Sequence, residues 1–168
     1  MKIQSLISTL FLTVVLLASG SEIREIKGGF AYTLPADWFQ DQLPNQMFKS
    51  ALGPDRPSGN PFISFHVETL KGNLAEMQAK SLRDLASAGK SSGLTDIKII
   101  VRPAFQTTSN EIGLSALIQG KCTDRDMREF LYLFQGKGDK VIAIACVTTE
   151  ATDDAVFDTI IKSFRTLP

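Results

Sequence analysis

Histidine is nearly absent from this chain, which has one such residue, His66, among 168. A Ser-His-Asp or Cys-His mechanism would have to use this residue as its general base. Typical zinc sites draw on several His and Cys ligands, and few of either are present. Strand alternation places His66 beside Ser64 and Glu68 on a polar face, where a solvated side chain is the plainer interpretation. We therefore expect no catalytic residues, no metal site and no cofactor.

Cysteine is also scarce, with Cys122 and Cys146 alone. In an exported protein they permit one disulfide. If the strands of the C-terminal half form a simple meander, the two residues lie on strands that flank a third strand, about 10 Å apart. A disulfide needs Cα atoms within about 7 Å. The pattern favours two half-buried free thiols and leaves a disulfide as the alternative.

An excess of charge of either sign is missing, since 18 basic residues balance 18 acidic ones. The chain has no basic surplus to neutralise phosphates, so we expect no nucleic-acid partner. With 43% hydrophobic and 21% charged residues, the composition is that of an ordinary globular protein rather than a disordered tail.

Acidic residues are absent before Glu22, and the chain begins with the layout of a secretory signal peptide. Lys2 gives a cationic start, residues 3–18 are mostly apolar, and small residues precede a cleavage site after Gly20. We expect an exported protein, periplasmic or extracellular, with a single domain over residues 21–168. An uncleaved leader that tethers the protein to the membrane is the alternative, although the apolar run is short for a span. No cysteine ends the run, which argues against a lipoprotein.

Alternation of apolar and polar residues predicts an antiparallel sheet whose last strands form a meander with tight turns. Pro103 is expected to end one strand before the next begins. Residues 141–147 are apolar on both faces, so we expect this strand to be central and covered on both sides. The predicted strands are residues 23–26, 30–34, 38–39, 47–52, 62–70, 97–101, 105–108, 114–122, 128–135 and 141–148.

Two helices are predicted. Asn73 with Glu76 resembles a capping box and opens the first helix, which we expect to stop at Gly89. Residues 152–154 (Thr-Asp-Asp) are expected to cap the second helix and to place acidic groups at its positive end. A broad apolar stripe follows over residues 156–164. This second helix should lie across the sheet and cover its apolar central strand.

The longest clear loop spans residues 53–61, where almost every residue is of a type that favours turns. Long loops on rigid sheets often carry binding residues. Arg56 lies within the loop, and Phe48 and Phe62 lie before and after it. These three residues are our candidate partner-binding site, with a plain connector as the alternative.

Three short sequence patterns occur along the chain, and we call their residues the fold marks. They are Phe30-x-Tyr32-x-Leu34-Pro35-x-x-Trp38, Tyr132-x-Phe134 and Ser163-Phe164-Arg165. The pattern resembles the PsbP-like family, which includes the DcrB-like envelope proteins of bacteria and eukaryotic Ran-binding relatives. The resemblance covers nearly all of residues 23–166. It implies an α+β domain, in which helices cover an antiparallel β-sheet and the C-terminal helix packs on the sheet. It also implies binding or assembly duties more often than catalysis, and it maps no binding residue onto this chain.

We therefore expect a non-catalytic exported protein of the cell envelope that binds or helps assemble an unknown protein partner. The leader disfavours the cytosolic Ran-binding and effector-chaperone roles that the fold alone would allow. A small hydrophobic-ligand-binding protein, with a pocket between sheet and helix, is the alternative. A hydrolase or metalloenzyme that uses His66 is less favoured.

Overall fold

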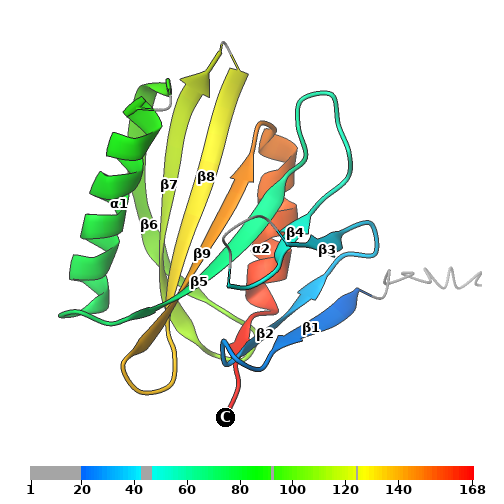
Figure 1. The fold of residues 1–168 in the computed structure, drawn as a ribbon, viewed down its shortest axis with the longest axis vertical. Coiled ribbons are helices and arrows are strands. Elements are labelled where there is room, and N and C mark those ends of the chain that lie inside the picture. The colour runs from blue at the N-terminus through cyan, green and yellow to red at the C-terminus, as the bar shows by residue number, and fades with distance from the viewer. Residues whose placement is uncertain (1–19, 43–46, 92, 124) are drawn as a thin grey trace, which may run out of the picture.

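The computed structural model describes residues 20–42, 47–91, 93–123 and 125–168. Its largest element is a seven-stranded antiparallel sheet in the spatial order β3-β4-β5-β9-β8-β7-β6 (Figure 1). The strands of this sheet are β3 (Phe39–Asp41), β4 (Ser50–Leu52), β5 (Phe62–Thr69), β6 (Thr95–Gln106), β7 (Ile112–Cys122), β8 (Arg125–Gln135) and β9 (Lys140–Thr148).

The apolar strand β9 is the fourth of the seven and therefore central, as its pattern predicts. On one face of the sheet its side chains are fully buried, at 1% exposure or less: Ile142, Ile144 and Cys146. On the other face Val141 is fully buried, whereas Ala145 is half-buried. The first face of β9 is therefore fully covered, as predicted. On the second face only the end of β9 at Val141 is covered.

The first face is covered by helix α2 (Asp154–Lys162) and by a small sheet of β1 (Ser21–Glu25), β2 (Phe30–Leu34) and β10 (Arg165–Thr166). A short 3-10 turn, η1 (Ala151–Asp153), leads into α2. Between these layers lies a core of aromatic rings, in which Tyr32 and Phe65 stack with ring centroids 4.4 Å apart. Phe157 and Phe164 are fully buried in it. The C-terminal helix thus packs on the sheet, and the predicted α+β class is confirmed.

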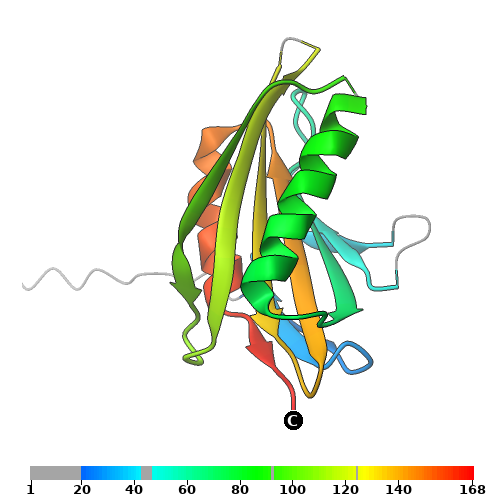
Figure 2. The same ribbon diagram turned by 90° about the vertical axis from the view of Figure 1, so that its left-hand side faces the viewer.

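Helix α1 (Leu74–Ser91) lies on the opposite side of the sheet from α2 (Figure 2). The Asn73 side-chain oxygen accepts a hydrogen bond from the Glu76 N–H at 2.9 Å, and the Glu76 carboxylate accepts one from the Asn73 N–H at 3.3 Å. This reciprocal pair is the predicted capping box. Met77 and Leu82 pack against side chains of β7, β8 and β9. The helix continues two residues past Gly89, its predicted stop.

Strand β6 is continuous, whereas the sequence analysis predicted two strands separated at Pro103. The pairing of β6 with β7 shifts register between Arg102 and Phe105, so Pro103 lies in an irregular stretch of the ladder. The Pro103 carbonyl accepts a hydrogen bond from the Ser115 hydroxyl at 3.0 Å. Because β6 is an edge strand with a bulge here, it tolerates a residue without an N–H.

The two cysteines lie on β7 and β9, on either side of β8, as the meander predicts. Cys122 pairs with Arg125 and Cys146 with Phe130, which are five residues apart along β8. Both thiols are free, with Cys122 half-buried and Cys146 buried. The prediction of two free thiols agrees with the structure, but Cys146 is fully buried rather than half-buried as predicted.

Residues 1–19, which carry nearly all of the predicted leader, lie outside the described residues. Across the described part of the chain, no helix combines the length and the apolar character needed to cross a membrane. The leader and its cleavage after Gly20 stay predictions.

Candidate functional site

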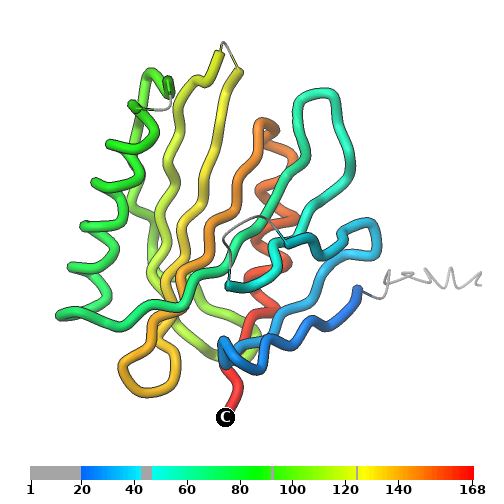
Figure 3. Tube along the Cα trace, viewed as in Figure 1, coloured from blue at the N-terminus to red at the C-terminus, as the bar shows by residue number. Residues whose placement is uncertain are grey.

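The loop of residues 53–61 joins β4 to β5 and lies beside the start of α2 (Figure 3). The structure places the three predicted site residues in different environments. Phe48 is 3% exposed and belongs to the aromatic core. Arg56 forms ion pairs with acidic residues that precede α2. Phe62 lines a groove on the other face of the sheet. The three side chains do not share one surface, and a partner-binding role for this loop stays a prediction.

Arg56 fixes the loop in place. Its guanidinium donates to both carboxylate oxygens of Asp153, at 2.8 and 2.9 Å, and to Glu150 at 3.2 Å. Ser58 adds a hydrogen bond to Glu150 at 2.6 Å. Of the predicted capping residues 152–154, Asp153 occupies the N-cap position of α2, but its side chain makes no cap hydrogen bond. Its carboxylate instead accepts from Arg56 and Thr148. These contacts therefore anchor the loop to the residues that precede α2.

A groove of about 610 Å³ lies between α1 and the part of the sheet that α1 leaves uncovered. Because α1 packs mainly on β6, β7 and β8, the same face of β5 and β9 remains open. We call this feature the α1 groove. Sites for small molecules typically have volumes of roughly 300–1,000 Å³, so the groove has a suitable size. Its walls are formed by α1 on one side and by β5 on the other, and its floor by β8 and β9.

Small side chains on the central strand create this hollow. β9 directs Ala143 and Ala145 into the α1 groove, while the alternating residues Ile142 and Ile144 point into the aromatic core. A larger apolar residue at position 145 would fill the space that alanine leaves open. Since Leu131 of β8 completes this part of the floor, the surface there is apolar.

One carboxylate interrupts the apolar floor. Glu129 lines the groove and pairs with Ile118 of β7 and Val147 of β9 in the ladder. No described residue forms a hydrogen bond or an ion pair with its carboxylate. Burial raises the pKa of Glu129. The side chain is half-buried, and charges shielded from water are normally paired, so Glu129 is an uncompensated group in the groove.

His66 lies on the β5 wall of the groove between Ser64 and Glu68, on the face predicted from strand alternation. Its side chain is exposed, and no hydrogen bond links it to any described residue. Among the described residues, no serine or cysteine therefore forms a hydrogen-bonded pair with this histidine. No group of three or more His, Cys, Asp or Glu residues within the described ranges is arranged to hold a metal ion.

The outer edge of β6 is a second candidate site. β6 ends the strand order, and among the described strands none pairs with its outer edge. Three consecutive β-branched residues on it are 42, 44 and 67% exposed: Ile99, Ile100 and Val101. Register shifts flank this stretch on both sides. We call it the β6 edge. Its β-branched residues predict a strand, but periodicity alone does not define which strand lies at an edge.

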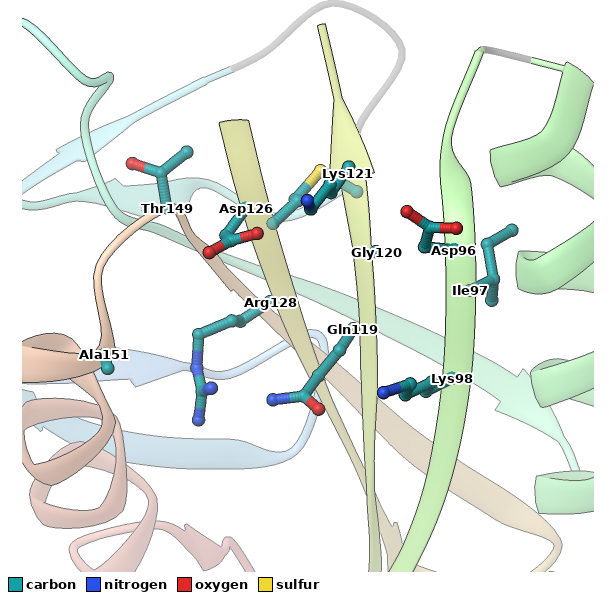
Figure 4. A pocket seen from close by; sticks show the side chains of 11 residues that line it. Asp96, Ile97, Lys98, Gln119, Gly120, Lys121, Asp126, Arg128, Thr149 and Ala151 are labelled. Carbon is teal, nitrogen blue, oxygen red and sulfur yellow. The ribbon is translucent and has the colours of Figure 1, made fainter. Parts of the chain in front are cut away.

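A polar hollow of about 710 Å³ opens beside the β6 edge, over the ends of three strands (Figure 4). Lys98, Gln119 and Arg128 form a row across β6, β7 and β8. Arg128 is already held by Asp154, to which its Nε donates at 3.1 Å. Lys98 and Lys121 form no ion pair with any residue that the structure describes. The apolar edge is thus bordered by two free ammonium groups.

Solved structures share this architecture over most of the chain. Cyanobacterial PsbP (CyanoP) from Synechocystis sp. PCC 6803 superposes with a TM-score of 0.64 at 14% identity, covering 91% of this chain and 95% of that one. The chain has a PsbP-like fold. LpqN, described as involved in cell envelope biogenesis of Mycobacterium tuberculosis, superposes with a TM-score of 0.60 at 10% identity and covers 89% of this chain and 86% of its own.

A third solved structure, from Bacteroides thetaiotaomicron, has a TM-score of 0.53 at 13% identity. It covers 89% of this chain, which corresponds to 49% of the longer Bacteroides chain. The sequence matches no protein-family model and no curated protein. At these identities the likeness establishes the PsbP-like fold and leaves the function open.

The aromatic residues of the fold marks lie in the core of the PsbP-like domain. Trp38 is 8% exposed, and its ring packs edge-on against Phe157 with centroids 5.9 Å apart. Phe134 stacks on Phe164 with centroids 4.6 Å apart. These contacts explain why the marks reveal the fold. Neither the α1 groove nor the β6 edge contains any of these residues.

Proposed function

We propose that this PsbP-like protein is a non-catalytic, exported accessory of the cell envelope that binds a protein partner through the β6 edge. The observation that carries the proposal is the exposed apolar stretch of Ile99, Ile100 and Val101 on an unpaired edge strand. An extended segment of a partner that adds to such an edge gains main-chain hydrogen bonds and contacts with alternate side chains. Long apolar edges left open are otherwise a hazard that proteins avoid.

The other sheet edges are less suited to this role. β3 has three residues and β10 has two, so each offers a short ladder. β1 carries three charged residues in five, which is a common way to protect an edge. β6 has twelve residues and presents an apolar centre. Its border of Lys98 and Lys121 favours a partner with acidic groups beside its apolar segment.

Two observations support a place in the envelope. The first is the predicted leader, which would direct the domain across a membrane. The second is the shared fold with LpqN, which is described as involved in cell envelope biogenesis. The exposed edge supports the accessory role, and so does the lack of a hydrogen bond between His66 and any described serine or cysteine.

Site-specific photo-crosslinking in intact cells tests the β6 edge. A photoreactive amino acid at Val101, which is 67% exposed, should yield one discrete adduct with another protein. The matched control places it at Phe39, which is 53% exposed on β3 at the opposite edge of the same sheet. Affinity purification should lose the partner with Val101→Lys and retain it with Phe39→Lys. An adduct between two copies of this chain alone, or no adduct from position 101, would contradict the proposal.

The α1 groove favours a second function, the binding of a small hydrophobic ligand. Its volume of about 610 Å³ and its alanine floor match the pocket between sheet and helix that this alternative requires. Native mass spectrometry of the protein purified from its own cells should show a bound small molecule. Ala145→Leu should release that molecule by filling the floor, whereas protein that is always recovered empty would contradict this function.

A further inference from the structure

We propose that the α1 groove binds an amphiphilic amine, with the ammonium group on the Glu129 carboxylate and the hydrocarbon tail along the alanine floor of β9. This inference rests on the second function proposed above and adds the chemical class of the ligand. It joins two features of the groove that have no role in the fold. These features are a hollow beside small side chains and a carboxylate that no described residue pairs with.

The register of β8 and β9 places the charge at one end of the apolar floor. Glu129 pairs with Val147, and two residues further along each strand Leu131 pairs with Ala145. Ala143 is four residues from Val147, so the floor extends roughly 14 Å from the carboxylate. A ligand with a charged head and a linear apolar tail matches this arrangement.

The other charged groups of the groove leave the carboxylate uncompensated. On the α1 wall, Lys80 forms an ion pair with Asp84 four residues later. On the β5 wall, Glu68 adds a further negative charge and His66 is exposed. A ligand carboxylate would meet the like charge of Glu129, whereas a ligand ammonium would neutralise it. The partial burial of Glu129 strengthens both effects, since charges interact more strongly where the dielectric constant is lower than that of water.

An uncharged amphiphile would fill the floor but leave Glu129 without a partner. Such a ligand would remove water from the half-buried carboxylate without replacing its hydrogen bonds, which is costly, and hydrogen bonds to charged groups are stronger than neutral ones. The packing around position 129 does not require a carboxylate, so ligand binding would give Glu129 a role. Ile118, Val147 and Leu131 surround it, and an apolar residue at position 129 would fit this surface better.

Calorimetric titration with three probes of equal chain length tests the ligand class: decylamine, decanol and decanoate, at neutral pH and below micelle-forming concentrations. We expect decylamine to bind most tightly and decanoate most weakly. Glu129→Gln preserves the shape of the side chain and should weaken decylamine binding about tenfold or more, with decanol unchanged. Glu68→Gln removes the same charge from an exposed position on the wall and should change decylamine binding less than about threefold.

The possible results distinguish failure of the amine assignment from failure of the proposal that the groove binds a ligand at all. Equal binding of the three probes, tighter binding of decanoate, or no effect of Glu129→Gln would overturn the amine assignment and leave a hydrophobic-ligand site in place. Failure of every probe to bind the wild-type protein would overturn both. Ala145→Leu should weaken all bound probes, because the tail and the added side chain compete for the same floor. Probes that bind this variant normally would show that they do not occupy the α1 groove.

Discussion

Arg56 forms an ion pair with Asp153, ninety-seven residues further along the chain, whose side chain is 2% exposed. The contact ties the loop of residues 53–61 to the start of α2. We predict that Arg56→Ala lowers the free energy of unfolding by about 3 kcal/mol, because it leaves a buried carboxylate without its cation. Arg56→Lys should recover part of the loss. Urea unfolding followed by circular dichroism measures the change.

The matched control is the exposed ion pair of Lys80 and Asp84, whose side chains are 71% and 62% exposed. Lys80→Ala should lower the free energy of unfolding by no more than about 0.5 kcal/mol, since solvent screens exposed pairs. An Arg56→Ala effect as small as that of Lys80→Ala would show that the loop is not anchored by this contact.

The capping box of α1 gives a second stability prediction. Asn73→Ala should lower the free energy of unfolding by about 1 kcal/mol, because the Glu76 N–H loses its side-chain acceptor at the helix start. Asn73→Asp should be close to neutral, since aspartate accepts the same bond and favours the helix dipole. Thermal unfolding of the two variants makes the comparison. Equal stability of Asn73→Ala and the wild type would contradict a role for this cap.

Much of the fold could be predicted because its signals are local. The alternation in β5 separates Ile63 and Phe65 of the core from Ser64 and His66 of the groove, and each is found on the predicted face. The apolar β9 is central as predicted. The capping box also depends on residues three apart. In each case a local pattern predicts the structure that is found.

The two candidate sites depend on long-range placement, which local patterns do not encode. The α1 groove exists because α1 packs mainly on β6 to β8 and leaves the alanine face of β9 open. The β6 edge follows from the strand order, and Pro103 suggested a break where the edge tolerates a bulge. The Arg56–Asp153 pair likewise joins a loop to the 3-10 turn η1, far apart in the sequence.

Alkaline pH should destabilise the protein through its two tyrosines, both of which are buried. Burial raises the pKa of Tyr32 from 10 to about 12. Burial, with Cys146 and Asp158 nearby, raises the pKa of Tyr132 further. A group with a raised folded-state pKa contributes stability that is complete below its unfolded pKa and lost as pH rises above it. The free energy of unfolding should therefore fall above about pH 10, by up to about 1.4 kcal/mol per pH unit for each tyrosine.

Tyrosinate absorbance checks this pH dependence. Ionisation of both tyrosines should coincide with loss of the folded circular dichroism signal. Tyr132→Phe removes a hydrogen bond to Asp158 and should lower stability by about 1 kcal/mol at neutral pH, while it reduces the alkaline loss. A tyrosine that ionises reversibly near pH 10 in the folded protein would contradict the burial of its hydroxyl.

The two thiols should differ in reactivity. Cys146 is fully buried, and burial raises its pKa well above the usual value, so the reactive thiolate is both inaccessible and disfavoured. Cys122 is half-buried near the β7–β8 turn. A disulfide reagent should label one thiol in the folded protein and two in denaturant, and Cys122→Ala should abolish the folded-state labelling. Rapid labelling of Cys146 in this variant would show that the sheet opens near β9.

The predicted leader makes a claim about the mature N-terminus. Cleavage after Gly20 would leave Ser21 as the first residue, which is also the first residue of β1, so the cut would preserve the pairing of β1 with β2. Intact-mass measurement of protein from the envelope fraction should show the loss of residues 1–20. Gly20→Phe should block cleavage, because the site requires a small residue, whereas Glu22→Gln, beyond the site, should be processed normally. If the wild-type protein keeps residues 1–20, the leader is an uncleaved anchor, and the partner at the β6 edge would have to be sought at the membrane surface.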